Sequence, residues 1–545
     1  MSNPSTHLID RVTDDLPCVR EIGFSIPERY NASQILFHNL MAGRAEKTAV
    51  YSPAGNATYG ELCAAASRYA HGLSSLGLSR GDRVLMFLND TASYPAAFFG
   101  AVRAGFVPIL CNTLTPPDLL RFYLEDGAVS VAVTDAAYAG LFEAAAAADG
   151  TPLKALIVVG DKKKVNAPVT LYDAEDWLKQ FPEHSEAADT QRNDMAFWMY
   201  SSGSTGRPKG IIHLQHDMAY TVESYANHIL GIREDDICFS IPKIFFAYGF
   251  GNSITFPFSV GASSVLYPGR PEAAPVFDCV ERYRPTLFFG LPTLYNALIA
   301  HPRAETADFS SVRLCLSAAE VLAEELFEAW KARFGLEILE GLGSTEVLHI
   351  YVSNTPSKKK VGTAGVRVPG YEIKLTTPDG DLVPPGEGGV MWVRGDSSSP
   401  SYWNRPEKTA ETMRDGWIWT GDRLVEDSEG FFTFAGRVDD LIKVSGQWVY
   451  PLEIELTLFE HECVKECAVI AMEMPDRRMT LKAFVVVEDG VTGDDRLSEE
   501  LKIFVKSKLL PFKYPRIVEY SAELPKTGTG KIDRQVLLRA REPSA

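Results

Sequence analysis

The chain has 545 residues, 46% of them apolar, and this length exceeds what a single hydrophobic core usually organises. Acidic residues number 71 and basic residues 54, which gives a formal net charge of -17 at pH 7. We therefore expect two or more domains, and the lack of a long basic block argues against a nucleic-acid partner.

The eight cysteines stand mostly singly within apolar segments, without the spacing of a disulfide scaffold or a zinc site. They predict reduced thiols and a cytoplasmic protein, and the polar start of the chain predicts no signal peptide. The most membrane-like stretch, 237–269, is interrupted by prolines and glycines, so we expect a buried wall or pocket there and no membrane insertion.

Up to about residue 340, short apolar strands alternate with amphipathic helical patterns, which predicts α/β architecture with parallel sheets. From 362 to 435 the pattern changes to period-two runs separated by Pro-Gly turns, which is typical of a β-rich region. The predicted strand and helix pairs are 83–88 with 93–103, 287–289 with 293–300, and 314–316 with 321–334; the predicted β-rich strands include 371–375 and 390–393.

After Gly436, predicted strands at 468–472 and 483–487 and a helix at 498–509 indicate a small α+β domain. We therefore expect a large N-terminal domain, 1–436, built from α/β sheets with a β-rich subdomain at about 362–435. A small, mobile α+β C-terminal domain, 437–545, should follow it.

The stretch SSGSTGRPKG, 201–210, follows the apolar run 195–200 and has the composition of a phosphate-binding loop. It is not a Walker A loop, because Pro208 stands where that motif needs its second glycine. Its glycines let backbone N-H groups approach an anion, its hydroxyls add donors, and Lys209 adds positive charge. We expect a strand to end at Tyr200 and a helical pattern to begin near His213.

Two further predicted strands end in small residues, at Leu316 before SAAE and at Leu339 before EGLGSTE. In open α/β sheets, ligands bind beyond the carboxyl ends of the strands. The three loops can therefore share one nucleotide.

Five motifs in this order resemble the signature motifs of the adenylate-forming superfamily, which contains acyl-CoA synthetases, peptide-synthetase adenylation domains and luciferases. The resemblance covers about residues 45–535, and within the superfamily it is greatest to benzoate-CoA ligases. The five motifs are SSGSTGRPKG, GSTE at 343–346, TGD at 420–422, GRVDDLIKVSG at 436–446 and PKTGTGK at 525–531; the benzoate-type segments are FWMY at 197–200, KIFFAYGFGN at 243–252 and GSTEVLHIYVSN at 343–354.

The resemblance implies three catalytic residues. Lys531 would bridge the acid carboxylate and the α-phosphate, and Thr345 would donate a hydrogen bond to that phosphate. Glu346 would hold Mg²⁺, a hard cation that prefers carboxylate, phosphate and water oxygens.

The resemblance also implies a set of ATP- and AMP-binding residues, in which Asp422 accepts the ribose hydroxyls with Arg437 beside it. Many relatives have Tyr where this chain has Leu342, so adenine would lose aromatic stacking and its recognition would depend more on the 317–319 backbone. The full set is Ser201, Ser202, Gly203, Ser204, Thr205, Gly206, Lys209, Ser317, Ala318, Ala319, Glu340, Gly341, Leu342, Gly343, Ser344, Thr345, Asp422 and Arg437.

The predicted acid pocket combines small residues with aromatic ones, which suits a compact, flat or branched acid. Benzoate-type relatives often have Gly where Ala319 stands, and its methyl group would narrow the pocket. The predicted lining is Phe246, Ala247, Tyr248, Gly249, Ala319, Leu342 and His349.

The two half-reactions need two arrangements of one site, and the family achieves this by rotating its C-terminal domain. Asp439 matches the hinge position of that rotation. Lys443, Ser445 and Gly446 would then line the channel for the pantetheine arm of CoA.

The sequence thus predicts an ATP-dependent carboxylate-CoA ligase that uses Mg²⁺ and acts on benzoate or a similar compact aromatic acid, and a homodimer is a further expectation. A ligase for a small branched or hydroxylated acid, such as 2-hydroxyisobutyrate, is the alternative. An amino-acid adenylation domain is disfavoured because Ala247 and Tyr248 offer no carboxylate to an α-ammonium group. Luciferase-like oxidation, and a nucleotide-binding regulatory protein without turnover, also stay open as alternatives.

Overall fold

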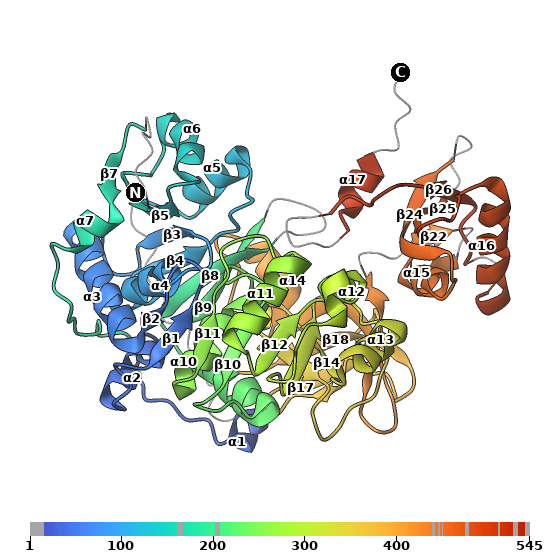
Figure 1. Cartoon of the computed structure of the whole chain (residues 1–545), viewed down its shortest axis with the longest axis horizontal. Coiled ribbons are helices and arrows are strands. Elements are labelled where there is room, and N and C mark those ends of the chain that lie inside the picture. Colours follow the sequence, from blue (N-terminus) through green and yellow to red (C-terminus); the bar gives the residue numbers. More distant parts are fainter. Residues whose placement is uncertain are drawn as a thin grey trace. The chain divides into compact units, whose positions relative to one another are not determined.

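The computed structural model (Figure 1) describes residues 16–160, 167–201, 208–438, 442–444, 447–449, 451–474, 479–510, 513–526 and 532–539. The chain forms two compact units. One runs to Ile373 and includes Trp392–Trp419, and the other comprises Lys374–Met391 and the chain from Thr420 onward. The boundary predicted near 436 stays a prediction.

The first unit contains a seven-stranded sheet whose neighbouring strands are parallel except for the last pair. Many of the strands are short and apolar, such as RVLMF in β3, and are followed by a helix. The helix returns the chain to the starting edge of the sheet, so the next strand runs parallel. In spatial order the strands are β7 (Thr170–Asp173), β6 (Ala155–Val159), β5 (Val131–Asp135), β3 (Arg83–Phe87), β4 (Val107–Leu110), β8 (Met195–Ser201) and β9 (Lys209–Leu214).

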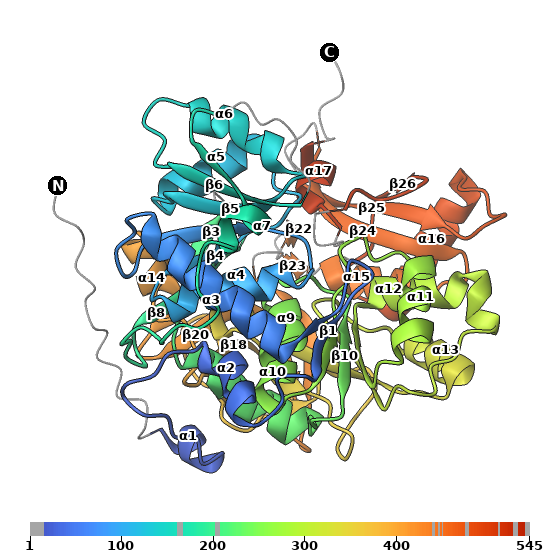
Figure 2. The ribbon, with the colours of Figure 1, turned by 60° about the vertical axis from the view of Figure 1, so that its left-hand side comes forward.

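Two long helices of this region, α3 (Tyr59–Ser75) and α4 (Ser93–Arg103), pack side by side (Figure 2). A capping box starts α3, because Thr58 and Glu61 each accept a hydrogen bond from the other's backbone N-H. Gly100 allows the close approach, since an added Cβ there would lie 2.6 Å from the carbonyl oxygen of Ala66. The other helices are α1 (Pro17–Glu21), α2 (Gln34–Met41), α5 (Pro117–Asp126), η1 (Ala139–Leu141), α6 (Phe142–Ala147) and α7 (Ala174–Leu178).

A nine-stranded sheet also belongs to the first unit, with a parallel centre and antiparallel strands at both edges. Its strands in spatial order are β16 (Val366–Arg367), β15 (Ile350–Ser353), β14 (Ile338–Gly343), β13 (Leu314–Ala318), β12 (Leu287–Gly290), β10 (Ile237–Ser240), β11 (Ser263–Val265), β1 (Thr48–Tyr51) and β2 (Ala57–Thr58). The associated helices are α8 (Asp217–Thr221), η2 (Val222–Leu230), α9 (Ala247–Phe250), η3 (Gly251–Thr255), α10 (Phe256–Val260), α11 (Ala273–Tyr283), α12 (Pro292–Ala300), η4 (Pro302–Glu305), α13 (Glu324–Phe334) and η5 (Thr345–Val347).

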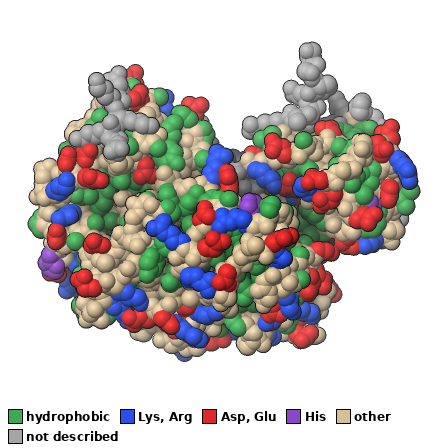
Figure 3. Space-filling view, viewed as in Figure 1, with side chains coloured by type: hydrophobic (Ala, Val, Ile, Leu, Met, Phe, Trp, Pro, Cys, Tyr) green, Lys and Arg blue, Asp and Glu red, His purple; other side chains and the backbone are tan. Residues whose placement is uncertain are grey.

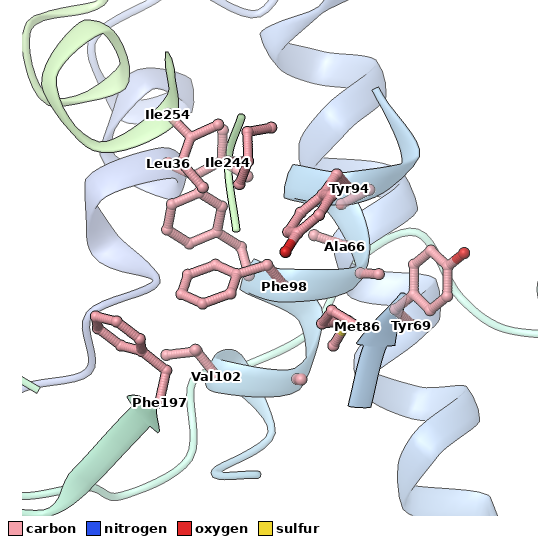
Figure 4. Close-up of a cluster of buried hydrophobic side chains, with 14 of the residues drawn as sticks. Leu36, Ala66, Tyr69, Met86, Tyr94, Phe98, Val102, Phe197, Ile244 and Ile254 are labelled. Carbon is pink, nitrogen blue, oxygen red and sulfur yellow. The ribbon is translucent and has the colours of Figure 1, made fainter. Parts of the chain in front are cut away.

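An apolar core connects elements of both sheets (Figure 4). Phe98 of α4 contacts Phe197 of β8 and Phe250 of α9, with ring centroids 5.6 Å and 5.1 Å apart. The segment 237–269 contributes buried residues to this core, including Ile244 and Ile254. The predicted buried wall is confirmed, and the structure breaks it into short strands and helices.

Beyond Val368 the chain forms a five-stranded sheet and then the α+β elements of the second unit. The unit boundaries lie within β17 (Glu372–Thr376), β18 (Gly388–Arg394) and β20 (Trp417–Glu426). The remaining elements are α14 (Pro406–Thr412), β19 (Met413–Arg414), β21 (Phe432–Arg437), β22 (Ile442–Val444), β23 (Gln447–Val449), α15 (Pro451–Phe459), β24 (Val464–Glu473), β25 (Met479–Val487), α16 (Asp495–Lys508), β26 (Ile517–Tyr520) and α17 (Arg534–Arg539).

The predicted α/β class is confirmed, but the structure predicted after the glycine-rich stretch 201–210 is wrong. The glycine-rich stretch does not lead into a helix near His213, because residues Lys209–Leu214 form β9, antiparallel to β8. Adjacent β-branched Ile211 and Ile212 favour a strand, and the helix α8 begins only at Asp217. The stretch therefore connects two antiparallel strands.

The surface of the described residues carries both signs of charge. On the face seen in Figure 3, Lys and Arg side chains are interspersed with Asp and Glu. All eight cysteines are free thiols, as predicted, and seven of them are buried. No helix among the described residues combines the length and apolar character that crossing a membrane requires.

Candidate functional site

The ends of β13 and β14 place several predicted nucleotide-binding residues beside one another. Ser317 pairs with Glu340 and Ala318 with Gly341 in the sheet register. The Oγ atoms of Ser317 and Ser344 are buried without a hydrogen-bond partner among the described residues. A buried polar atom of this kind is a candidate ligand contact.

The loop that carries the motif EGLGSTE, 340–346, is shorter than the sequence predicted. We expected it to begin at Glu340, but β14 continues through Gly343 and pairs antiparallel with β15. The glycines at 341 and 343 occupy strand positions because β15 supplies the hydrogen-bonding partner that the sequence pattern did not reveal. The connection between β14 and β15 therefore begins only at Ser344 and contains the short helix η5.

Two residues of the site region have left-handed backbone conformations that are costly for residues with a Cβ. Ala319, directly after β13, has φ 73°, and Leu348, directly after η5, has φ 69°. Such strain costs of order 1–3 kcal/mol and is concentrated at functional sites. Ala319 is exposed, whereas Leu348 is buried in the core.

The buried His213 of β9 holds the loop that carries Thr345 and Glu346. Its Nδ1 lies 2.8 Å from Oδ2 of Asp217, and its Nε2 lies 2.8 Å from the carbonyl oxygen of Thr345. The ring therefore contacts acceptor oxygens on two different segments. The ring also stacks on Phe197, with centroids 5.2 Å apart, which ties the loop to the core of Figure 4.

A second buried histidine extends this polar network. The Nδ1 of His216 lies 2.8 Å from the carbonyl oxygen of Arg192, and its Nε2 lies 3.2 Å from Oδ1 of Asp396 and 3.4 Å from Oδ1 of Asp217. Burial disfavours the charged ring, but the two carboxylates outweigh burial and raise the pKa of His216 to about 9. The imidazolium therefore balances buried negative charge at neutral pH.

Tyr402 connects the two residues expected to contact Mg²⁺ and phosphate. Its hydroxyl donates to Oε1 of Glu346 at 2.9 Å, and the Nζ of Lys209 lies 4.5 Å from its ring centroid. The backbone N-H of Ser399 also donates to the carbonyl oxygen of Glu346, at 2.6 Å. The structure thus brings together Lys209 and the Thr345–Glu346 loop.

His213 and Tyr402 were missed by sequence reasoning, and no local pattern identifies them. His213 lies 132 positions from Thr345, and Tyr402 lies 56 positions from Glu346. Each stands in an apolar or aromatic stretch, IIHL and SYWN, where a core position is the ordinary interpretation. Only the pairing of distant elements reveals their contacts.

The predicted acid pocket is aromatic and buried around His349. The ring of His349 lies 5.6 Å from that of Tyr248 and 4.5 Å from that of Phe256. Neither of its nitrogens makes a well-formed hydrogen bond to a described residue. Burial lowers the pKa of the His349 imidazole to about 3, and the Tyr248 backbone offsets only part of this effect, so the ring is neutral.

The other predicted pocket residues lie in the neighbouring elements. Ala247 is buried, and Phe246 is partly buried against Phe245, with ring centroids 4.7 Å apart. Gly249 is required by close packing, because an added Cβ would lie 2.1 Å from the carbonyl oxygen of Lys243. Ala319 follows β13 and Leu342 lies in β14; their part in the same pocket stays a prediction.

Glu340 has a position that the sequence did not suggest. Its carboxyl is buried, and Oε1 accepts a hydrogen bond from the backbone N-H of Leu322 at 3.2 Å. Burial raises the pKa of Glu340 to about 8, which the Leu322 bond only partly counteracts. This side chain is therefore mostly uncharged at neutral pH and stabilises the connection after β13.

The predicted ribose pair lies in the second unit. Asp422 is buried in β20 and its Oδ1 accepts a hydrogen bond from Arg437 of β21 at 2.7 Å. Asp422 therefore stands in a strand and is not a turn residue. The contact of this pair with ribose stays a prediction.

Several predicted residues lie outside the described part of the chain, among them the catalytic lysine and the hinge. For Lys443 only the backbone is described, in β22. The residues outside are Ser202, Gly203, Ser204, Thr205, Gly206, Asp439, Ser445, Gly446 and Lys531.

Comparison with protein families decides the classification. The model of the "AMP-binding enzyme" family matches residues 37–403, and that of the "AMP-binding enzyme C-terminal domain" matches residues 453–531. The chain belongs to the AMP-binding enzyme family. The predicted superfamily is confirmed, and the two matched ranges agree with a large N-terminal and a smaller C-terminal domain.

Named members of the AMP-binding enzyme family resemble this chain over almost its whole length. Benzoate–CoA ligase of Thauera aromatica is 43% identical over 512 residues, 93% of this chain and 96% of that protein. Among solved structures, the anthranilate CoA ligase AuaEII in complex with anthranoyl-AMP is 37% identical, with a TM-score of 0.89 over 95% of this chain and 98% of that one. A benzoate CoA ligase from Burkholderia xenovorans LB400 is 39% identical, with a TM-score of 0.85 over 94% of this chain and 100% of that one.

Proposed function

We propose that the protein is an ATP-dependent, AMP-forming carboxylate-CoA ligase whose substrate is benzoate or a similar compact aromatic acid. The observation that carries the proposal is the meeting of Lys209 and Glu346 on Tyr402, beside Thr345, in a chain of the AMP-binding enzyme family. Positive charge, a carboxylate for a cation and a hydroxyl donor are the groups that a triphosphate needs.

The first half-reaction would join the acid to AMP. A carboxylate oxygen attacks the α-phosphorus of ATP, the bond to the β-phosphate oxygen breaks, and pyrophosphate leaves. Lys209 and the hydroxyl of Thr345 would stabilise phosphate charge, and Lys531 would bridge the carboxylate and the α-phosphate. Removing one preorganised donor of this kind typically costs about 10²- to 10³-fold in rate.

Glu346 fits a magnesium ligand, because its carboxylate is partly exposed and is oriented through Oε1 by Tyr402. When bound, Mg²⁺ would neutralise charge on the triphosphate. Ser317 and Ser344, whose hydroxyls are buried without partners among the described residues, would donate to the nucleotide.

The second half-reaction would form the thioester. The CoA sulfur attacks the acyl carbon, and the bond from that carbon to the AMP phosphate oxygen breaks. AMP then leaves, and the acyl group stays bound to the CoA sulfur. Rotation about Asp439 would bring Lys443, Ser445 and Gly446 to the thiol channel, and Asp422 with Arg437 would hold the ribose.

The neutral, aromatic surroundings of His349 favour a flat acid without a second charge. The benzoate and anthranilate enzymes named above support this choice, because both acids combine one carboxylate with one ring. A small branched or hydroxylated acid is the second candidate, favoured by the methyl group of Ala319. We also propose a cytoplasmic location and leave a homodimer as a prediction.

The test is a panel of carboxylic acids assayed for AMP release with and without CoA, with the thioester identified by mass spectrometry. We expect CoA-dependent thioester from benzoate-sized aromatic acids. Turnover restricted to small branched acids would contradict the aromatic assignment, and AMP release that never yields a thioester would contradict the ligase class.

Lys531→Ala separates the half-reactions in the same assay. It should abolish adenylate formation while presynthesised acyl-AMP is still converted to thioester. Equal loss of both steps would contradict the role given to Lys531.

A further inference from the structure

Hydrogen bonds from the backbone N-H groups of Tyr402 and of the next residue, Trp403, fix the position of Tyr402. Its N-H donates to Oγ1 of Thr409 at 3.0 Å, and the N-H of Trp403 donates to the carbonyl oxygen of Gly210 at 2.8 Å. The Tyr402 side chain is 3% exposed. The phenol therefore has a fixed position relative to β9 and to the Thr345–Glu346 loop.

The hydroxyl and the ring of this side chain contact groups of opposite charge. The hydroxyl donates to Oε1 of Glu346 at 2.9 Å, and the ring face lies 4.5 Å from Nζ of Lys209. The first contact is a charge-assisted hydrogen bond and the second is a cation–π contact. One tyrosine side chain thus contacts both an ammonium and a carboxylate of the site.

We propose that Tyr402 is a positioning residue that orients Glu346 for the metal ion through its hydroxyl and positions Lys209 for phosphate through its ring. The proposal rests on the function proposed above. It adds a residue that acts through Glu346 and Lys209. A hydrogen bond to Oε1 restricts rotation of the carboxylate and so directs Oε2. The contact of its ring with Nζ restricts the position of the Lys209 side chain in the same way.

Two substitutions separate these effects. Tyr402→Phe removes the hydroxyl and keeps the ring, whereas Tyr402→Leu removes both. The readout is the affinity for a non-hydrolysable ATP analogue, measured by calorimetry with and without Mg²⁺, which gives the gain in affinity that the metal provides. Tyr59→Phe is the matched control, because it also removes a buried tyrosine hydroxyl, one that donates to the carbonyl oxygen of Ala262.

We expect Tyr402→Phe to reduce the Mg²⁺-dependent gain by about 10-fold, the lower range for the loss of an outer partner of a metal ligand. Affinity without Mg²⁺ should stay unchanged in this variant and fall in Tyr402→Leu, which loses the support of Lys209. Tyr59→Phe should keep both values. In a Glu346→Gln background, Tyr402→Phe should have no further effect on the gain, since it acts through that carboxylate.

The outcomes distinguish this proposal from the proposed function. If Glu346→Gln keeps the Mg²⁺-dependent gain, the metal role of Glu346 is wrong. If Glu346→Gln loses the gain and Tyr402→Phe keeps it, the positioning role of Tyr402 is overturned. An equal further loss when Tyr402→Phe is added to Glu346→Gln would also overturn it. If Tyr402→Leu fails to fold, Tyr402→Phe by itself still tests the positioning role of the Tyr402 hydroxyl.

Discussion

Two regions a few residues apart in the chain differ in how far their polar groups are hydrogen-bonded. Around Thr345 and Glu346, His213, Ser399 and Tyr402 all contribute hydrogen bonds. Around His349, polar atoms are buried among aromatic rings, and its two nitrogens have no well-formed hydrogen bond to a described residue. The protein therefore preorganises the first region, whereas the second keeps unused hydrogen-bonding capacity.

The largest effect on stability should come from disrupting the buried network of Asp217, His213 and His216, which supports the first region. Asp217 is fully buried, and Asp217→Ala leaves His213 and His216 without their shared carboxylate. Removing one partner of a buried ionic pair costs about 3–5 kcal/mol, so the midpoint of urea unfolding should fall strongly. The exposed Asp118→Ala, in the first turn of α5, is the control and should cost under about 1 kcal/mol. Similar midpoints for both variants would show that the network contributes little.

The second region should respond in function and not in stability. His349→Leu replaces a buried imidazole that lacks well-formed hydrogen bonds, so thermal stability should be unchanged or slightly raised. The KM for an aromatic acid should rise about 10-fold, the equivalent of one lost hydrogen bond of about 1.4 kcal/mol, while the KM for ATP stays constant. An unchanged KM for the acid would mean that His349 only packs.

Ala319→Gly should show that backbone strain at the site is avoidable. Glycine adopts the left-handed conformation without steric cost, which offsets its extra freedom in the unfolded chain. We expect no loss of stability and a gain of up to about 1 kcal/mol, together with better turnover of larger ring-substituted acids. Ala64→Gly within helix α3, the control, should lose about 1 kcal/mol. Equal losses would contradict the strain argument.

A further prediction concerns the pH dependence of stability. The folded-state pKa of Glu340 is raised to about 8 from an ordinary 4.5, so the folded state keeps a proton that the unfolded state releases. The stability that this proton provides is fully present below pH 4.5 and is lost as the pH rises towards 8. Glu340→Gln should therefore make thermal stability decline less between pH 5 and 8, measured by calorimetry. Parallel pH profiles would contradict the raised pKa.

Much of the fold follows from the sequence because apolar runs and helical periodicity are local. The predicted helix 93–103 is α4, and the strand at 314–316 is the beginning of β13. The strand after the glycine-rich stretch was missed because Gly210 and His213 interrupt its apolar pattern, and pairing with β8 decides its conformation. The contacts of Tyr402 and His213 could not be predicted because they join segments that only the folded chain brings together.

The central claim is that these loops let an organic acid displace pyrophosphate from ATP. Exchange of labelled pyrophosphate into ATP, measured with Mg²⁺ and an aromatic acid but without CoA, tests this claim most directly. We expect exchange that requires both the acid and Mg²⁺ and that Lys531→Ala abolishes. No exchange with any of a wide range of carboxylic acids, or exchange that does not depend on the acid, would contradict it.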